Sequence, residues 1–132
     1  MISAYNSALS GLDAASQRMA VSANNIANQF STYSDVNGQT TDAPYVPQDI
    51  VQASQDNTGG VTTYTKPRNP ASIPYFTPDS PQADSNGMVD YPNVSPENEM
   101  MNVILASNSY KASVKTLQTQ DEMFATLLDI KS

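Results

Sequence analysis

The stretch that decides the fold is residues 96–130, which read PENEMMNVILASNSYKASVKTLQTQDEMFATLLDI. Along it, positions spaced alternately three and four residues apart form one line, and all except Ser107 and Asp121 are apolar. This is the spacing of a heptad seam, by which one helix packs lengthwise against another. The seam consists of Met100, Val103, Ser107, Tyr110, Val114, Leu117, Asp121, Phe124 and Leu128.

Other large apolar residues of this stretch lie away from the seam, around most of the predicted helix. They are Met101, Ile104, Leu105, Met123, Leu127 and Ile130. A helix that is apolar on most sides is buried on most sides, and the rest of the 132-residue chain offers little that resembles a core. We therefore expect these residues to form an inter-subunit surface that other copies or other proteins cover.

A second seam of the same spacing begins at the N-terminus, with Ser16 as its polar break. Its positions are Ile2, Tyr5, Leu9, Leu12, Ser16, Met19, Ala23, Ile26 and Phe30. Many flanking residues are alanine, which favours helix and lets a neighbouring helix approach closely. Gly11 costs about 1 kcal/mol in a helix interior relative to alanine, so it is either a tolerated flaw or a point of close approach. The helix is expected to fray near Asn24, Asn25 and Asn28.

The two seams predict a mostly α fold with a small β and irregular insertion. Residues 1–30 and 96–132 are expected to form one helical domain, in which the two helices pair as an antiparallel coiled coil. Residues 31–95 form the insertion, which is polar and rich in proline. Antiparallel pairing is the simplest way to close a chain with a long helix at each end.

Within the insertion, Tyr45–Ala53 and Val61–Lys66 alternate weakly and are separated by the turn-forming residues 56–60, which predicts a β-hairpin. Residues 31–41 read as a loop. Five prolines between residues 66 and 81 disfavour ladder pairing and suggest an extended strap. Asn86-Gly87 predicts a turn into a short strand, and Ser95-Pro96-Glu97 has the residue types that begin a helix.

Composition excludes several function classes. The formal net charge of -7, without any basic stripe, argues against nucleic acid as a partner. The absence of cysteine and histidine removes the usual nucleophiles, general base and metal ligands, so we expect no catalytic site, metal or cofactor. The longest aliphatic run, Val103–Ala106, is far below the roughly 20 residues of a membrane span. The N-terminus has no features of a cleaved signal peptide.

Carboxylate pairs are the remaining candidates for chemistry, because two of them can cleave a glycosidic bond. The pairs are Glu97 with Glu99, and Asp121 with Glu122. Placement at the positive end of a helix dipole, or on a solvated or interfacial surface, explains them better. The acidic turn Asp84-Ser85-Asn86-Gly87 lacks the spacing of a calcium loop and reads as a plain turn.

Several segments carry a resemblance to a known family. Residues 7–19 lead into Asn24, Asn25, Ile26, Ala27 and Asn28. Further segments are Pro44-Tyr45 with Gln48–Val51, then Gly87–Val94, and then Glu99–Tyr110 continuing to Leu128–Ile130. With these segments the chain resembles the rod proteins of the bacterial flagellar basal body, and most of all their C-type proximal-rod subunits.

This resemblance implies a structural subunit without enzymatic activity. It implies export through the flagellar type III apparatus without cleavage, and helical polymerisation through the terminal helices into the periplasm-spanning drive shaft. That shaft transmits torque from the basal-body ring to the hook and filament. The implied partners are copies of the chain, other rod subunits, and the hook-basal-body adaptor and MS ring or export gate at the rod base.

The alternative from another class is a small helical adaptor or export chaperone that acts as a discrete oligomer. A stable, monodisperse oligomer at high concentration would favour this alternative over open-ended polymerisation.

Overall fold

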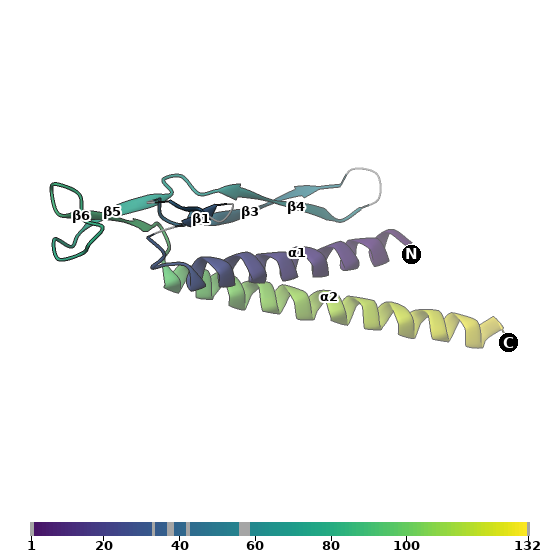
Figure 1. Cartoon of the computed structure of the whole chain (residues 1–132). Helices are drawn as coiled ribbons and strands as arrows, with labels where there is room; N and C mark the ends of the chain where they lie inside the picture. Colours follow the sequence, from purple (N-terminus) through teal and green to yellow (C-terminus); the bar gives the residue numbers. More distant parts are fainter. Residues whose placement is uncertain (1, 33, 37–38, 42, 56–58, 132) are drawn as a thin grey trace.

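A computed structural model describes residues 2–32, 34–36, 39–41, 43–55 and 59–131. Its two long helices, α1 (Ile2–Ala27) and α2 (Pro96–Lys131), lie side by side and antiparallel (Figure 1). The segments between them form small two-stranded sheets. The expected mostly helical fold with a small β insertion is therefore confirmed. Within the described ranges, neither helix combines the length and apolar character needed to cross a membrane.

The strands pair as three antiparallel hairpins: β1 (Ser34–Val36) with β2 (Gln39–Thr41), β3 (Gln48–Ser54) with β4 (Val61–Pro67), and β5 (Ser72–Phe76) with β6 (Met88–Pro92). The β3–β4 hairpin lies along α1, which is thus sandwiched between this hairpin and α2 (Figure 1). The β5–β6 hairpin extends beyond the helix pair, past the end of α1 (Figure 1).

The predicted β-hairpin is confirmed as β3–β4, although Asp56, Asn57 and Thr58 of its turn lie outside the described residues. The loop expected over residues 31–41 is wrong in part, because β1 and β2 pair there. The strap expected over residues 66–81 is also wrong for Ser72–Phe76. There, Pro74 lies opposite Asp90 in the ladder, and a two-stranded sheet tolerates a missing N–H because each strand is an edge strand.

The helix termini follow their local chemistry. The Ser95 hydroxyl accepts the Asn98 N–H at 3.4 Å and donates to the Glu97 carboxylate at 3.0 Å, so the predicted start of the last helix is confirmed. The first helix ends at Ala27, within its asparagine-rich segment and before the last seam position, Phe30. A hydrogen bond from the Asn28 amide to the Asn24 carbonyl at 2.9 Å stabilises this end.

The two helices meet along a narrow line of small residues. Its buried members, at seven-residue spacing, are Ala8, Ala15 and Ser22 on α1, and Ala106 on α2. A Cβ placed on Gly11 would lie 2.9 Å from Ser113 Oγ, so this glycine is a point of close approach. In both helices each buried residue of this line directly precedes a position of the predicted seam; Ala106, for example, precedes Ser107. The contact is displaced in this way because the helices approach closest where their side chains are small.

Gly11→Leu is expected to lower the free energy of unfolding by about 1–3 kcal/mol, because its side chain would force the two helices apart. Gly11→Ala should cost less than about 1 kcal/mol, since its gain in helix propensity offsets a shift of the Ser113 hydroxyl. Ala20→Leu, at an exposed position of α1, is the control. Urea unfolding followed by circular dichroism would measure all three, and equal stabilities of the two leucine variants would contradict the close approach.

Candidate functional site

Asn25 of α1 lies at the centre of a buried polar cluster. Its side chain is 1% exposed. The amide group donates to the Gln48 carbonyl at 2.8 Å and to Glu99 Oε1 at 3.2 Å. The amide oxygen accepts the Gln48 N–H at 3.0 Å and the Tyr45 hydroxyl at 3.1 Å. One side chain thus joins α1 to the start of β3 and to the first turn of α2.

Arg68, directly after β4, completes this cluster. Its guanidinium donates to Asp49 Oδ1 at 2.7 and 3.0 Å and to Glu99 Oε1 at 2.7 Å. It also donates to the Asn93 carbonyl at 2.9 Å, in the segment that leads into α2. We call Asn25, Tyr45, Asp49, Arg68 and Glu99 the polar clamp, because together they hold both helices and the β3–β4 hairpin.

Backbone hydrogen bonds also position the clamp residues. The Arg68 N–H donates to the Pro47 carbonyl at 2.8 Å, which closes the open end of the β3–β4 hairpin. The Tyr45 N–H donates to the Ser31 carbonyl at 2.9 Å, just after α1. Pro47, between these two points, is fully buried. These contacts hold Tyr45 beside Asn25 and Asp49 beside Arg68.

The charges in the clamp explain its pKa shifts. Burial would lower the pKa of Arg68, but its hydrogen bonds to Asp49 and Glu99 and their charges raise it overall, so Arg68 stays charged. Glu99 is only 2% exposed, and a carboxylate at this depth requires such a partner. Burial, followed by the charge of Glu99, raises the pKa of Tyr45, and Arg68 opposes this shift. The cluster is therefore a structural clamp whose carboxylates are held by hydrogen bonds and ion pairs.

The clamp fixes how the helices are aligned. Asn25 faces Glu99, and the same number of residues separates Asn25 from Gly11 as separates Glu99 from Ser113. The two contacts therefore define one register along the helix pair. Continued to the start of α1, this register ends opposite Glu122, so the last part of α2 extends past α1 (Figure 1).

Many predicted seam positions are not covered within one chain. Exposed members are Tyr5, Leu9, Phe30, Met100, Tyr110, Phe124 and Leu128. Half-buried members are Leu12, Met19, Ile26, Val103, Val114 and Leu117, and the side chain of Ile2 lies outside the described part. All predicted inter-subunit residues are exposed: Met101, Ile104, Leu105, Met123, Leu127 and Ile130. Their role in assembly stays a prediction.

The segments that carried the family resemblance converge at the clamp. Asn25, Tyr45, Asp49 and Glu99 each come from one of these segments, which lie far apart in the sequence. Sequence reasoning treated Glu99 as a helix-dipole residue and did not identify Arg68. The only signal for Arg68 was that it is one of two basic residues, with Lys66, in the insertion.

Comparison with known proteins gives matches at both ends of the chain and over its whole length. Residues 6–32 match the family described as flagella basal body rod protein. Residues 85–130 match the flagellar basal body rod FlgEFG protein C-terminal family. The flagellar basal-body rod protein FlgC of Yersinia enterocolitica is 36% identical over 131 residues, covering 98% of this chain and 97% of the relative. The chain belongs to the FlgC family of flagellar basal-body rod proteins.

Other FlgC proteins give the same result across distant bacteria. FlgC of Salmonella typhimurium is 34% identical over 98% of this chain and 97% of the relative. FlgC of Aquifex aeolicus is 31% identical over 94% of this chain and 92% of the relative. FlgC-family rod proteins are structural proteins, which agrees with the clamp's role in holding elements together. The carboxylate pair Glu97 and Glu99 serves the same purpose, since the two side chains bond to different partners.

Asn25→Ala is expected to lower the free energy of unfolding by about 3 kcal/mol, because it removes the hydrogen-bond partner of the part-buried Gln48 N–H and of the buried Glu99 carboxylate. Asn24→Ala is the matched control, since Asn24 is the exposed neighbour, and should change stability by less than about 0.5 kcal/mol. Chemical unfolding at neutral pH would measure both. Equal losses of stability in the two variants would show that the end of α1, and not the clamp, determines the change in unfolding free energy.

The raised pKa of Tyr45 predicts an alkaline loss of stability. A group whose folded pKa lies above its ordinary value, here 10.0, contributes stability below that value and loses it as pH rises through the folded pKa. The unfolding free energy should therefore fall above about pH 10, and less steeply in Tyr45→Phe. Tyr64→Phe, at an exposed tyrosine of β4, should retain the steep fall. Identical alkaline slopes in the two variants would contradict the assignment.

Proposed function

We propose that this rod protein polymerises helically through its terminal helices into the proximal rod, and so forms part of the shaft that transmits torque to hook and filament. In this proposal residues 1–30 and 96–132 act as one assembly domain, and residues 31–95 are its insertion. The observation that carries the proposal is the division of side chains in the helix pair. Small residues fill the line of closest approach between the helices, and many large apolar residues remain exposed.

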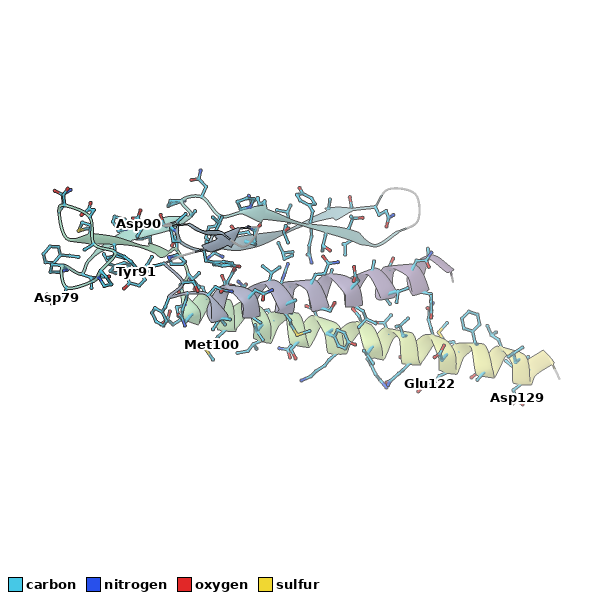
Figure 2. All side chains as sticks on the ribbon, viewed as in Figure 1. Asp79, Asp90, Tyr91, Met100, Glu122 and Asp129 are labelled. Carbon is cyan, nitrogen blue, oxygen red and sulfur yellow. The ribbon has the colours of Figure 1, made fainter. Side chains whose placement is uncertain are left out.

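The start of α2 illustrates this division. Met100, Met101, Ile104 and Leu105 are between 52% and 60% exposed. Glu99 and Ala106, next to them in sequence, are buried, so the apolar patch lies on the side of α2 away from α1. Figure 2 shows Met100 on that outer side of α2. A contiguous exposed apolar patch of this kind marks a protein–protein contact, and rod subunits of the same architecture could cover it.

The other partners and the location follow from the same proposal. We infer contacts with neighbouring copies and other rod subunits, and with the hook-basal-body adaptor and the MS ring or export gate at the rod base. We also infer export through the flagellar type III apparatus without a cleaved signal peptide, into the periplasm-spanning part of the rod. The discrete adaptor or export chaperone is not favoured, because the full-length relatives carry the name of a rod protein.

Torque transmission has a physical basis in this arrangement. Long helices packed on several sides by neighbouring helices resist twisting, because protein interiors are close-packed and have low compressibility. A shaft built from such subunits would need the exposed apolar residues as its shared core. Isolated subunits are therefore expected to be less stable than assembled ones, since binding to the folded state stabilises it.

Ile104→Lys is expected to prevent rod assembly while leaving the isolated chain folded. The residue is 59% exposed, so its replacement should change the unfolding free energy by less than about 0.5 kcal/mol. In assembly, however, it would bury a charge without a partner. Thr116→Lys, at an exposed polar position of the same helix, is the control.

Swimming in soft agar and electron microscopy of isolated basal bodies would measure the effect in cells whose only copy carries the variant. Circular dichroism of the purified variants would confirm folding. Normal swimming with Ile104→Lys would contradict an assembly role for this face of α2.

A further inference from the structure

The two ends of the helix pair differ in shape. At one end, α2 continues beyond the start of α1, and its last turns lie past the helix that covers the rest of it (Figure 1). We call residues 123–130 the overhang. All five of its large apolar residues are exposed, with Leu128 at 71% and Ile130 at 78%; the others are Met123, Phe124 and Leu127.

The apolar residues of the overhang share one side of the helix. At 3.6 residues per turn they span an arc of about 160° that is centred on the direction of Gln120. Gln120 is buried and lies at heptad spacing from Glu99 and Ala106, so it belongs to the side that faces α1. Glu122 and Asp129 lie on the opposite side, away from α1 (Figure 2). The apolar face of the overhang therefore continues the α1-facing surface of α2 beyond the start of α1.

At the other end of the molecule there is an aromatic groove of about 470 Å³ between the end of α1, the β5–β6 hairpin and the start of α2. Its lining includes Phe30, Tyr75, Tyr91, Val94 and Pro96. Tyr75 and Tyr91 pack edge to face, with ring centroids 5.7 Å apart. Phe30 is 76% exposed, and none of the residues that line the groove is charged.

We propose that the overhang of one subunit docks into the aromatic groove of a second copy of this chain. This inference rests on the proposed function and names the surfaces that form its joint along the helix axis. The second copy would place the end of its α1 on the overhang, beyond the start of the first copy's α1. The exposed apolar face would thus continue an interface that already exists within each chain.

The charges of the two ends favour this docking and select its orientation. The β5–β6 hairpin carries Asp79 and Asp90 (Figure 2), and residues 69–110 contain no lysine or arginine. An overhang that presented Glu122 and Asp129 to this region would bring like charges together, which is unfavourable. With its apolar face in the uncharged groove, the overhang turns these carboxylates outward.

The joint is heterologous, because it uses a different surface on each partner. A contact of this kind leaves a free overhang at one end of every pair and a free groove at the other, so addition can continue. A symmetric pairing of two overhangs would instead close at a dimer. The proposed joint is therefore of a kind that permits repeated addition along one axis.

Disulfide trapping can test the joint, because the chain has no cysteine of its own. Thr77→Cys places a thiol in the groove lining, and Leu128→Cys places one on the overhang. The two full-length variants are mixed at high concentration and oxidised. Thr62→Cys, at an exposed position of β4 far from the groove, replaces Thr77→Cys in the control mixture.

We expect about tenfold or more mixed dimer from Thr77→Cys with Leu128→Cys than from the control mixture, because docking raises the effective concentration of the two thiols. The double variant Thr77→Cys/Leu128→Cys should form a ladder of oligomers. Adding Phe30→Asp to the Thr77→Cys protein should remove most of the mixed dimer.

Equal yields in both mixtures, no product in either, or Leu128→Cys homodimers as the main product would overturn the joint. These outcomes leave the proposed function intact if the wild-type chain is still recovered in isolated basal bodies. Conversely, efficient trapping by a chain that is absent from basal bodies would refute the proposed function and retain the joint.

Discussion

The hydrogen bond between Asn25 and Glu99, with Arg68 on the same carboxylate oxygen, is the interaction on which the rest of the structure depends. Helices that meet through alanine, serine and glycine at heptad spacing present a smooth surface, which by itself gives little preference for one register over a slide of one heptad. A buried polar group favours one register over the others, because any shift of the helices leaves it without its hydrogen-bond partner. In this chain the same cluster also holds the β3–β4 hairpin, so one set of contacts aligns three elements.

Small residues between the helices have an energetic consequence. Apart from Pro47 and Pro92, the buried apolar residues of the described chain are Ala8, Ala14, Ala15, Val89 and Ala106. Each removes little apolar surface from water, and the hydrophobic contribution to folding scales with that surface. Most of the large apolar side chains, which would contribute more, are exposed or only half-buried. In the proposed assembly, folding stability and assembly are therefore coupled, since Ile104 and Leu127 are exposed in the single chain.

The sequence alone predicted the parts of this structure that depend on local residue patterns. The three-and-four spacing predicted both helices, and the turn-forming residues predicted the β3–β4 hairpin. It could not identify which face of α2 meets α1, because apolar residues such as Met101 and Leu117 lie on most sides of the helix. Periodicity also favours large apolar residues, whereas the closest packing uses small ones. The clamp could not be predicted from the sequence for another reason. Arg68 and Glu99 are far apart in the chain, and only the fold brings them together.

The clamp and the aromatic groove lie at the same end of the molecule, and the contacts of Arg68 connect them. Its guanidinium binds the Asn93 carbonyl, and the next residue, Val94, lines the groove. The Asn93 N–H in turn donates to the Ala71 carbonyl at 2.9 Å, which ties the same segment to the start of β5. The cluster that sets the helix register therefore also holds the segment that contributes Val94 to the groove. Since the register determines how far α2 extends past α1, both ends of the proposed joint depend on this one cluster.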